Sequence, residues 1–579
     1  MLILLTPPWL LAGDFNETRS LTERDHGSED MAKRCDKFNN VIKNNGLIDL
    51  GFSGPIYTWG RGTSWATRKS ARLDRSLCNA AWRTRFQEGA VRHLPHSHSD
   101  HCPLLISPTG FGGLHPKPKP FRFQAAWLEH CKFEEFLHQK WQPQQPLVSS
   151  LAALTKELCC WNREVFGNLF RRKRKTWARL EGIQRCLSNG GPLHLLKLEM
   201  RLRTELNTVL QEIETLWFQK SRVAAIQDGD RNTKYFHIST IIRRRANRIE
   251  ALQQEDGHWI SSAEEIKHLV VDYFATLFTE PLASPRIDLP SGLFPRLPET
   301  TLTELSKPYS STEILRALRS MAPFKAPGPD GFPALFFRRY WNLVGPSTCE
   351  LVLGVLNGRH LPEGLNDTFL VLLPKEDHPH KINQFRPIGL CNVAYKLVTK
   401  VLVHRLQKIL PNLISPSQSS FVPGRQISDN IVIMQEALHS MRRKRGSRGF
   451  MAIKLDLEKA YDRLNWQFIR DTLLEMRLPQ LMVEVIMMCL TSCSMRILWN
   501  GEPTSCFHPS RGIRQGDPLS AYLFVACMER LSQLIEGMVR SGQWNPLQVG
   551  RNSPQTSSLF FADDVVLFAE ATATQARLI

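Results

Sequence analysis

The sequence lacks any CxxC pair, although its 579 residues include 13 cysteines. The cysteines are scattered, with one adjacent pair at Cys159 and Cys160. An odd number without a regular framework argues against a disulfide-built fold and against a paired-cysteine zinc site. It indicates reduced thiols in a cytosolic or nuclear setting.

Long apolar runs are also missing. No stretch approaches the ~20 apolar residues of a membrane span. The opening MLILLTPPWLL is apolar, but it has no basic leader and contains Pro7 and Pro8, so it reads as the approach to a strand. We therefore expect no signal peptide, no transmembrane segment and no membrane partner.

Acidic residues are in the minority. The chain has 55 Asp and Glu against 74 Lys and Arg, which gives a formal net charge of +19. Residues 161–250 hold nineteen Lys and Arg against nine Asp and Glu, a local net charge of +10. This concentration indicates contact with nucleic-acid phosphates. Within it, RRKRK at 171–175 is open to two other readings, a solvated helix face or a nuclear localisation signal.

The composition of the sequence and the spacing of its apolar residues divide the chain into three domains. Residues 1–110 alternate short apolar runs with polar turns, as in an α/β or β-rich domain, and the Pro- and Gly-rich stretch 107–120 reads as a linker. Residues 121–283 form a basic helical linker, because apolar residues recur there at helical spacing. Residues 300–579 alternate helices and short strands.

Two acidic sites stand next to buried strands. In SSLFFADDVVLFAE, Asp563 and Asp564 interrupt an apolar run, which predicts a solvated hairpin turn, a buried arginine partner or bound metal ions. In GFMAIKLDLEKAYDRLNWQF, alternation places Asp456 opposite the apolar stripe of a strand. Read alone, Asp456 is equally well a surface residue.

A third segment lies between these two sites. PSRGIRQGDPLSAYLFVACMERL forms a basic, flexible turn before an apolar helix that starts near Pro518. Exposed amides and a positive helix end favour a phosphate or a nucleobase. The three carboxylates could hold two divalent cations about 3.5–4 Å apart, as phosphoryl transfer from a nucleotide requires.

The motifs LDLEKAYDRLNW, RGIRQGDPLS and FADD, in this order, resemble the reverse transcriptases of plant non-LTR (LINE-type) retrotransposons. The resemblance extends upstream through FKAPGPDGFPALFFRRYW, LLPKEDHPHKINQFRPIGLCNVAYKLVTKVLVHRL and SPSQSSFVPGRQISDNI. It implies an α+β fold with right-hand fingers and a palm of ferredoxin-like antiparallel sheet. It also implies a nucleotidyltransferase, an RNA-directed DNA polymerase that performs target-primed reverse transcription.

The resemblance carries roles to particular residues. Catalytic and metal-binding roles fall on Asp456, Asp563 and Asp564, which would hold two Mg²⁺ or Mn²⁺ ions. Nucleotide-binding roles fall on Lys375, Arg386, Tyr461, Gln515 and Gly516, with Tyr461 as the gate against a 2′-hydroxyl. The implied partners are an RNA template, a DNA primer or target and deoxynucleoside triphosphates, in a ribonucleoprotein of nucleus and cytoplasm.

The first hundred residues carry a separate resemblance. WLLAGDFNE, YTW, ARLDR and HSHSDHCPLL are similar to the C-terminal half of the endonuclease/exonuclease/phosphatase family, a truncated α/β sandwich. It points to Asp14, Asn16, Asp100 and His101, with an acid orienting the imidazole for work on a phosphodiester. The family's metal-binding Glu would lie before Met1, so we expect an inactive nuclease. A zinc site of His93, His96, His98 and His101 is the alternative.

Two other functions stay open. One is a catalytically inactive, doubly truncated remnant that only binds nucleic acid, and the other is an RNA-templated RNA polymerase. Trp217, Tyr235 and Phe236 stand among basic residues, where they could stack on unpaired bases or pack in a core.

Overall fold

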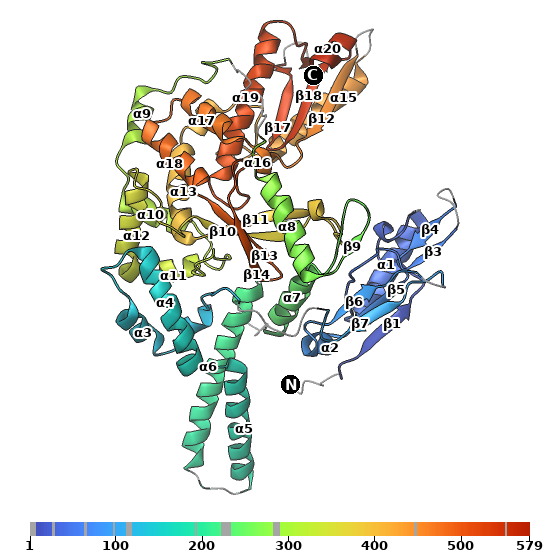
Figure 1. Ribbon diagram of the computed structural model, residues 1–579, viewed down its shortest axis with the longest axis vertical. Coiled ribbons are helices and arrows are strands. Elements are labelled where there is room, and N and C mark those ends of the chain that lie inside the picture. Colours follow the sequence, from blue (N-terminus) through green and yellow to red (C-terminus); the bar gives the residue numbers. More distant parts are fainter. Residues whose placement is uncertain are drawn as a thin grey trace.

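The computed structural model describes residues 7–25, 29–62, 67–96, 99–111, 119–189, 192, 194–221, 233–281, 290–444, 449–549 and 553–579. The first six residues of the apolar opening, half of the predicted 107–120 linker (residues 112–118), and His98 lie outside this set. Helices predominate, and the strands form several small sheets (Figure 1).

The N-terminal unit is built around the antiparallel sheet β1-β5-β2. Strand β1 begins at Leu10, directly after the prolines, as the strand reading of the opening predicts. The elements of this unit are β1 (Leu10–Asp14), α1 (Glu29–Asn44), β2 (Ile48–Asp49), β3 (Trp59–Arg61), β4 (Lys69–Ala71), β5 (Asp74–Cys78), α2 (Ala80–Arg85), β6 (Ala90–His93) and β7 (Leu104–Ser107).

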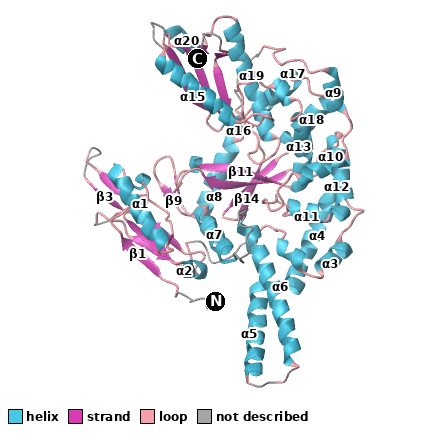
Figure 2. Ribbon diagram, turned by 180° about the vertical axis from the view of Figure 1, so that it is seen from behind, coloured by secondary structure: helices cyan, strands magenta, loops and turns pink. Residues whose placement is uncertain are grey.

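The middle of the chain is mostly helical. Its long helices α5 and α6 form a hairpin that projects from the body, as both views show (Figures 1 and 2). The elements are α3 (Phe133–Lys140), α4 (Leu147–Trp161), α5 (Leu169–Ser188), α6 (Leu195–Ser221), α7 (Thr233–Ala246), β8 (Leu252–Gln253), β9 (Trp259–Ile260) and α8 (Ala263–Leu277).

One hydrophobic core joins this helical region to the C-terminal part. Trp127 and Phe133 belong to the same buried cluster as Phe336 on α11 and Val398 on α13. The three-domain division stays a prediction, but apolar burial crosses its second boundary. The helices that follow that boundary are α9 (Glu299–Ser306), α10 (Ser311–Arg319), α11 (Ala334–Arg339), α12 (Trp341–Leu356), α13 (Val393–Leu406), α14 (Leu410–Leu413) and α15 (Ile427–Arg443).

A four-stranded sheet, ordered β11-β10-β13-β14, lies next to α8. Its strands are β10 (Asp367–Pro374), β11 (Phe385–Cys391), β13 (Ser494–Trp499) and β14 (Glu502–Phe507). Leu370 and Ile497 from the sheet share a buried cluster with Val270 and Phe274 of α8. This packing fixes the end of β10, where Lys375 follows.

The last sheet is three-stranded and antiparallel, ordered β12-β18-β17. Helices contact both faces: Val566 and Phe568 cluster with Ala437 of α15, while Val565 and Leu567 join the large core that contains Phe524. The elements here are β12 (Phe450–Asp456), α16 (Ala460–Arg463), α17 (Trp466–Glu475), α18 (Gln480–Thr491), α19 (Ser520–Arg540), β15 (Leu547–Gln548), β16 (Gln555–Thr556), β17 (Ser558–Phe561), β18 (Asp564–Glu570) and α20 (Ala573–Leu578).

Within the described ranges, no helix combines the length and the apolar content that a bilayer span needs.

Candidate active site

Strand pairing brings two of the predicted carboxylates together. Asp456 is the last residue of β12, and its cross-strand partner is Asp564, the first residue of β18. Direct partners in an antiparallel ladder project to the same face of the sheet. Two residues 108 positions apart therefore meet at one sheet end, Asp456 exposed and Asp564 half-buried.

Asp563 lies in the hairpin turn between β17 and β18. Its neighbour Ala562 adopts the left-handed conformation with φ 63°, and the Ala562 amide donates to Gln418 Oε1 at 3.3 Å. Asp563 faces Tyr461: burial first, and the charge of Asp563 second, raise the pKa of Tyr461 to about 12. Asp563 thus lies in a half-exposed turn, while Asp564 is already part of β18.

A lysine ammonium already lies among these carboxylates. Lys454 Nζ is 3.0 Å from Asp564 Oδ1. The hydrogen bond with Asp564 and its charge, together with Asp456, raise the pKa of Lys454. In the described part of the chain, no set of one oxygen each from Asp456, Asp563 and Asp564 lies within 4.8 Å of one another.

This arrangement fits divalent cations in its chemistry. Hard cations prefer carboxylate oxygens, and the ammonium of Lys454 shows that a positive charge is favourable at Asp564. Closing the oxygens around two metal ions requires Lys454 to move aside, which is possible because its side chain is 68% exposed.

Tyr461 is held firmly beside this site. Its ring stacks on Phe524 of α19, with centroids 4.5 Å apart and planes 14° apart. The backbone amide of Ile513 donates to Tyr461 O at 2.8 Å. A fixed aromatic ring next to Asp563 is what the predicted gate requires.

A further carboxylate, Asp462, was not singled out from the sequence. It is buried, and Gln515 Nε2 donates to Asp462 Oδ1 at 3.5 Å. Burial raises the pKa of Asp462 to about 6, although the charges of Lys375 and Lys459 act to lower it. Asp462 therefore joins two predicted nucleotide-binding residues, Lys375 and Gln515. The signal was present, because an acid directly follows Tyr461 at the start of a short helix.

The predicted finger residues lie at the edge of the four-stranded sheet. Lys375 is exposed, and its Nζ donates to Asn383 O at 3.2 Å. Arg386 is exposed on β11, opposite Leu373 of β10. Both cations are therefore accessible to solvent at this edge of the sheet.

Gly516 and Gln515 cross that sheet closely. The Gly389 amide donates to Gln515 O at 2.6 Å. A Cβ on Gly516 would lie 2.5 Å from Gly389 O, and Gly516 has φ 115°. Only glycine fits at this position, so the turn that follows β14 is held against β11.

One basic residue of this turn, Arg514, is satisfied by partners within the protein. Its guanidinium is buried, 3.0 Å from Asp517 Oδ2, and it also donates to the Tyr395 hydroxyl. Further donation goes to Asn366 Oδ1 at 2.6 Å and Thr368 Oγ1 at 2.8 Å. These acceptors lie on elements far away in sequence, so the turn alone could not show that they satisfy Arg514.

A second cluster lies in the N-terminal unit. Asp14, Asp74 and His101 bring one ligand atom each within 4.8 Å of one another. Asp14 and Asp74 are cross-strand partners in β1 and β5, and His101 Nδ1 is 2.8 Å from Asp74 Oδ2. Burial lowers the pKa of His101, but the hydrogen bond and charge of Asp74, with Asp14 and Asp100 behind, raise it overall.

The acid that holds the imidazole is thus Asp74, and the adjacent Asp100 does something else. Asp100 Oδ2 accepts from Trp59 Nε1 at 3.1 Å. Asn16 uses its backbone amide to donate to Asp14 Oδ1 at 2.8 Å. Asp74 is the acid of the ARLDR motif, for which the sequence predicted no site residue.

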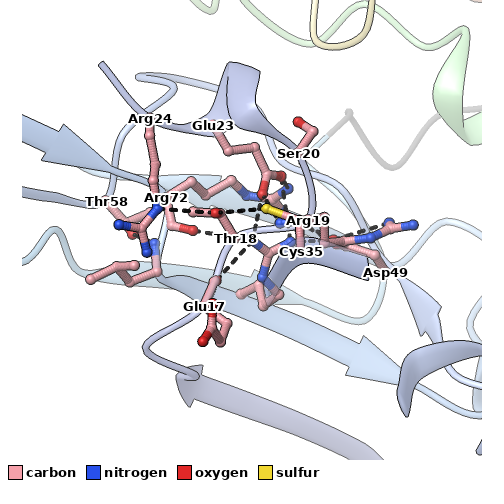
Figure 3. Close-up of polar contacts among 12 residues, drawn as sticks. Glu17, Thr18, Arg19, Ser20, Glu23, Arg24, Cys35, Asp49, Thr58 and Arg72 are labelled. Carbon is pink, nitrogen blue, oxygen red and sulfur yellow. Dashed lines mark hydrogen bonds and ion pairs between the residues drawn. The ribbon is translucent and has the colours of Figure 1, made fainter. Parts of the chain in front are cut away.

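ARLDR is anchored by buried charges on either side of Asp74. Arg72 is 1% exposed and contacts Glu23 and Asp49 at 2.8 and 3.1 Å, as Figure 3 shows. Arg75 contacts the same two acids, at 2.8 and 3.0 Å. Burial alone would raise the pKa of Asp49, but the two arginines hold it well below its ordinary value. This network fixes the strand that presents Asp74.

The alternative zinc site of four histidines does not form in the described residues. His93 is buried, stacks on Phe52 with centroids 4.2 Å apart, and its Nδ1 is 2.7 Å from Pro55 O. Burial lowers the pKa of His93 to about 3. His93 is a core side chain, and His101 bonds Asp74 instead.

Together, β12, β18 and the turn of Asp563 place three carboxylates at one end of the β12-β18-β17 sheet, with Lys454 and the stacked Tyr461 beside them. Carboxylates of this kind suit metal-assisted transfer of nucleotides. The class of protein that this chemistry indicates is a nucleotidyltransferase.

Comparison with known proteins narrows the class. Residues 373–578 match the family described as reverse transcriptase (RNA-dependent DNA polymerase). The chain is 27% identical over 585 residues to a 149 kDa protein of transposon TX1 from Xenopus laevis, covering 97% of this chain and 43% of that protein. It is 30% identical over 257 residues to the Pol polyprotein of type-2 retrotransposable element R2DM from Drosophila melanogaster, covering 44% of this chain and 23% of that protein.

A third relative is shorter. An uncharacterized mitochondrial protein of Arabidopsis thaliana is 49% identical over 65 residues, which is 11% of this chain and 53% of that protein. The chain spans less than half the length of the TX1 and R2DM proteins. The prediction of a non-LTR retrotransposon reverse transcriptase domain is confirmed. Plant origin and the nuclease assignment stay predictions.

Proposed function

We propose that the chain is the RNA-directed DNA polymerase of a LINE-type retrotransposon. The observation that carries this proposal is the cross-strand pairing of Asp456 with Asp564, beside Asp563, within residues that match the reverse transcriptase family. The relatives from transposon TX1 and retrotransposable element R2DM support an origin in a mobile element.

The proposed chemistry is attack of a primer 3′-hydroxyl on the α-phosphate of a deoxynucleotide. Asp456, Asp563 and Asp564 would hold two Mg²⁺ ions, or Mn²⁺, which stabilise the attacking and leaving oxygens when bound. Lys375 and Arg386 would bind the triphosphate, Arg386 through a planar fork and Lys375 as a mobile charge.

The remaining residues position the nucleotide. Tyr461, stacked on Phe524, closes the space that a 2′-hydroxyl would need. Gln515 and Gly516 pack on the template and the new base pair, in a turn that Gly389 keeps in place. The proposal includes an RNA template, a DNA primer or target, and a location in nucleus and cytoplasm.

Primer extension on an RNA template tests it. The full chain with Mg²⁺ should extend a DNA primer with deoxynucleotides, and Asp563→Asn should lower the rate at least about 100-fold because a metal-binding charge is lost. Asp471→Asn is the matched control, since Asp471 is exposed on α17 and accepts a hydrogen bond from Gln467 of the same helix. Extension that survives in Asp563→Asn would contradict the proposed site.

The same experiment separates the two alternatives. An inactive remnant would bind primer and template without extending the primer. The separation of the three carboxylates favours this outcome, because no set of one oxygen from each lies within 4.8 Å of one another. An RNA polymerase would prefer ribonucleotides, which Tyr461 opposes.

For the N-terminal unit we propose part of an endonuclease/exonuclease/phosphatase site. The convergence of Asp14, Asp74 and His101 supports it, because two acids can hold a cation and Asp74 can orient the imidazole. Titration with Mn²⁺, followed by electron paramagnetic resonance, should show one bound ion fewer in the double variant Asp14→Asn/Asp74→Asn. Equal numbers of bound ions would contradict this site.

A further inference from the structure

The hairpin of α5 and α6 exposes large aromatic side chains. Trp177 is 54% exposed and Phe170 is 43% exposed. Residues at i, i+4 and i+7 share one face of a helix, so Phe170, Arg174 and Trp177 form a single row along α5. The inward face of α5 is separate and carries Thr176 and Leu180, which are buried against the hairpin.

The row continues at the base of the hairpin. The Phe170 ring centroid is 6.3 Å from that of Trp217 on α6, and Trp217 is 4.0 Å from the ring of His237 on α7. Lys220 Nζ lies 4.9 Å from the Trp217 ring centroid. Trp177, Phe170, Trp217 and His237, with Arg174 and Lys220, are called the aromatic row below.

The structure distinguishes between the aromatic residues that the sequence grouped as either stacking or core side chains. Phe236 is 3% exposed and belongs to the core, and Trp217 is half-buried and packs against the large core. His237 Nε2 is buried and has no hydrogen-bond partner among the described residues. A core explains Phe236 but leaves Phe170 and Trp177 unexplained.

Positive charge surrounds the aromatic row. Helix α5 has seven Lys and Arg against a single Glu, and its exposed cations include Arg171, Arg174 and Lys175. Burial lowers the pKa of Lys220, and the charges of Arg244 and Lys119 lower it further. Like charges that repel one another at the hairpin base favour a polyanionic partner.

We propose that the aromatic row binds a single strand of nucleic acid, outside the palm. Flat rings stack on unpaired bases while neighbouring cations contact the backbone, which together make a sequence-tolerant platform. Phe170 and Trp177 are about 10 Å apart along the helix, close to three base steps. A duplex keeps its bases paired and offers no face to these rings. The proposal goes beyond polymerisation and does not require it.

Fluorescence anisotropy with the full chain tests the proposal. Labelled 30-nucleotide single strands of RNA and of DNA, and a duplex of the same sequence, are titrated without nucleotides or metal. Trp177→Ala with Phe170→Ala should weaken single-strand binding about tenfold for each ring, and should leave duplex binding nearly unchanged. The two labelled strands show whether RNA or DNA is preferred. Arg174→Glu should weaken binding and flatten its salt dependence.

Matched controls come from the N-terminal unit. Trp9 is 38% exposed there, and Trp9→Ala removes the same ring without touching the hairpin. Lys33 is 78% exposed, and Lys33→Glu makes the same kind of charge reversal. Neither should change single-strand binding by more than about twofold.

Three outcomes would overturn the proposal. The first is unchanged single-strand binding in the double variant, the second is an equal loss in Trp9→Ala, and the third is binding to anionic lipid vesicles in place of oligonucleotides. Primer extension is measured separately with saturating template. An inactive wild type would contradict the polymerase proposal, while the binding results would still decide the aromatic row.

Discussion

Lys454 and Asp564 form an ion pair of 3.0 Å across β12 and β18. Because the ammonium occupies a carboxylate proposed to bind Mg²⁺, it competes with the metal for the same oxygens. Lys454→Met should therefore lower the Mg²⁺ concentration for half-maximal primer extension by about threefold or more. Lys140→Met breaks an exposed pair with Glu157 and serves as control. A variant that needs more Mg²⁺ would argue against competition.

Tyr461 should set the choice of sugar. Tyr461→Val opens space next to Asp563 and should raise ribonucleotide use relative to deoxynucleotides about tenfold or more, as a ratio of kcat/KM. Tyr461→Phe keeps the ring on Phe524 and should discriminate like the wild type. Single-nucleotide incorporation measures both variants. Unaltered discrimination in Tyr461→Val would exclude the gate.

Arg514 and Asp517 should behave as one buried unit. Arg514→Met leaves the carboxylate of Asp517 buried without its cation, and the free energy of unfolding should fall by about 3–5 kcal/mol. The double variant Arg514→Met/Asp517→Asn should lose less than the sum of the single losses. Urea denaturation measures all three. Arg540→Met is the control. It removes the ion pair with Glu536, in which the Arg540 side chain is 78% exposed, and it should change the free energy of unfolding by less than about 1 kcal/mol.

The stability of the fold should decrease with pH through Asp462. Its pKa in the folded chain is about 6, against an ordinary value of 3.8. Below pH 3.8 both states are protonated and this contribution is fully present; as pH rises through 6 it is lost, because the unfolded chain ionises first. The free energy of unfolding should fall by about 2.4 kcal/mol between pH 4 and 7.

Asp462→Asn cannot ionise and tests that slope. Urea denaturation at a series of pH values should give a flatter profile for the variant than for the wild type over this range. Parallel profiles would show that other groups cause the pH dependence.

Local pattern was enough for the elements that carry Asp456 and Asp563. Alternation predicted the strand that ends at Asp456, a hairpin turn was one of the three alternatives for Asp563, and the helix expected near Pro518 begins at Ser520. Resemblance then ordered these pieces, and the family match agrees with it.

Contacts between distant segments escaped the sequence. Asp74 bonds His101 across 27 positions, and Arg514 is satisfied by Asn366 across 148. Asn366 has no signature of its own, and the motif around Asp74 does not show which imidazole that acid contacts. Burial decides which one does, and burial follows from the whole fold.

The shared core of Trp127, Phe133 and Phe336 has a practical consequence for producing the protein. A shorter recombinant chain cut near residue 300 would bare the side of α11 that these aromatic rings cover. Such a fragment would expose apolar surface and tend to aggregate, so a recombinant chain for study of the reverse transcriptase domain should keep the helices from residue 121 onward.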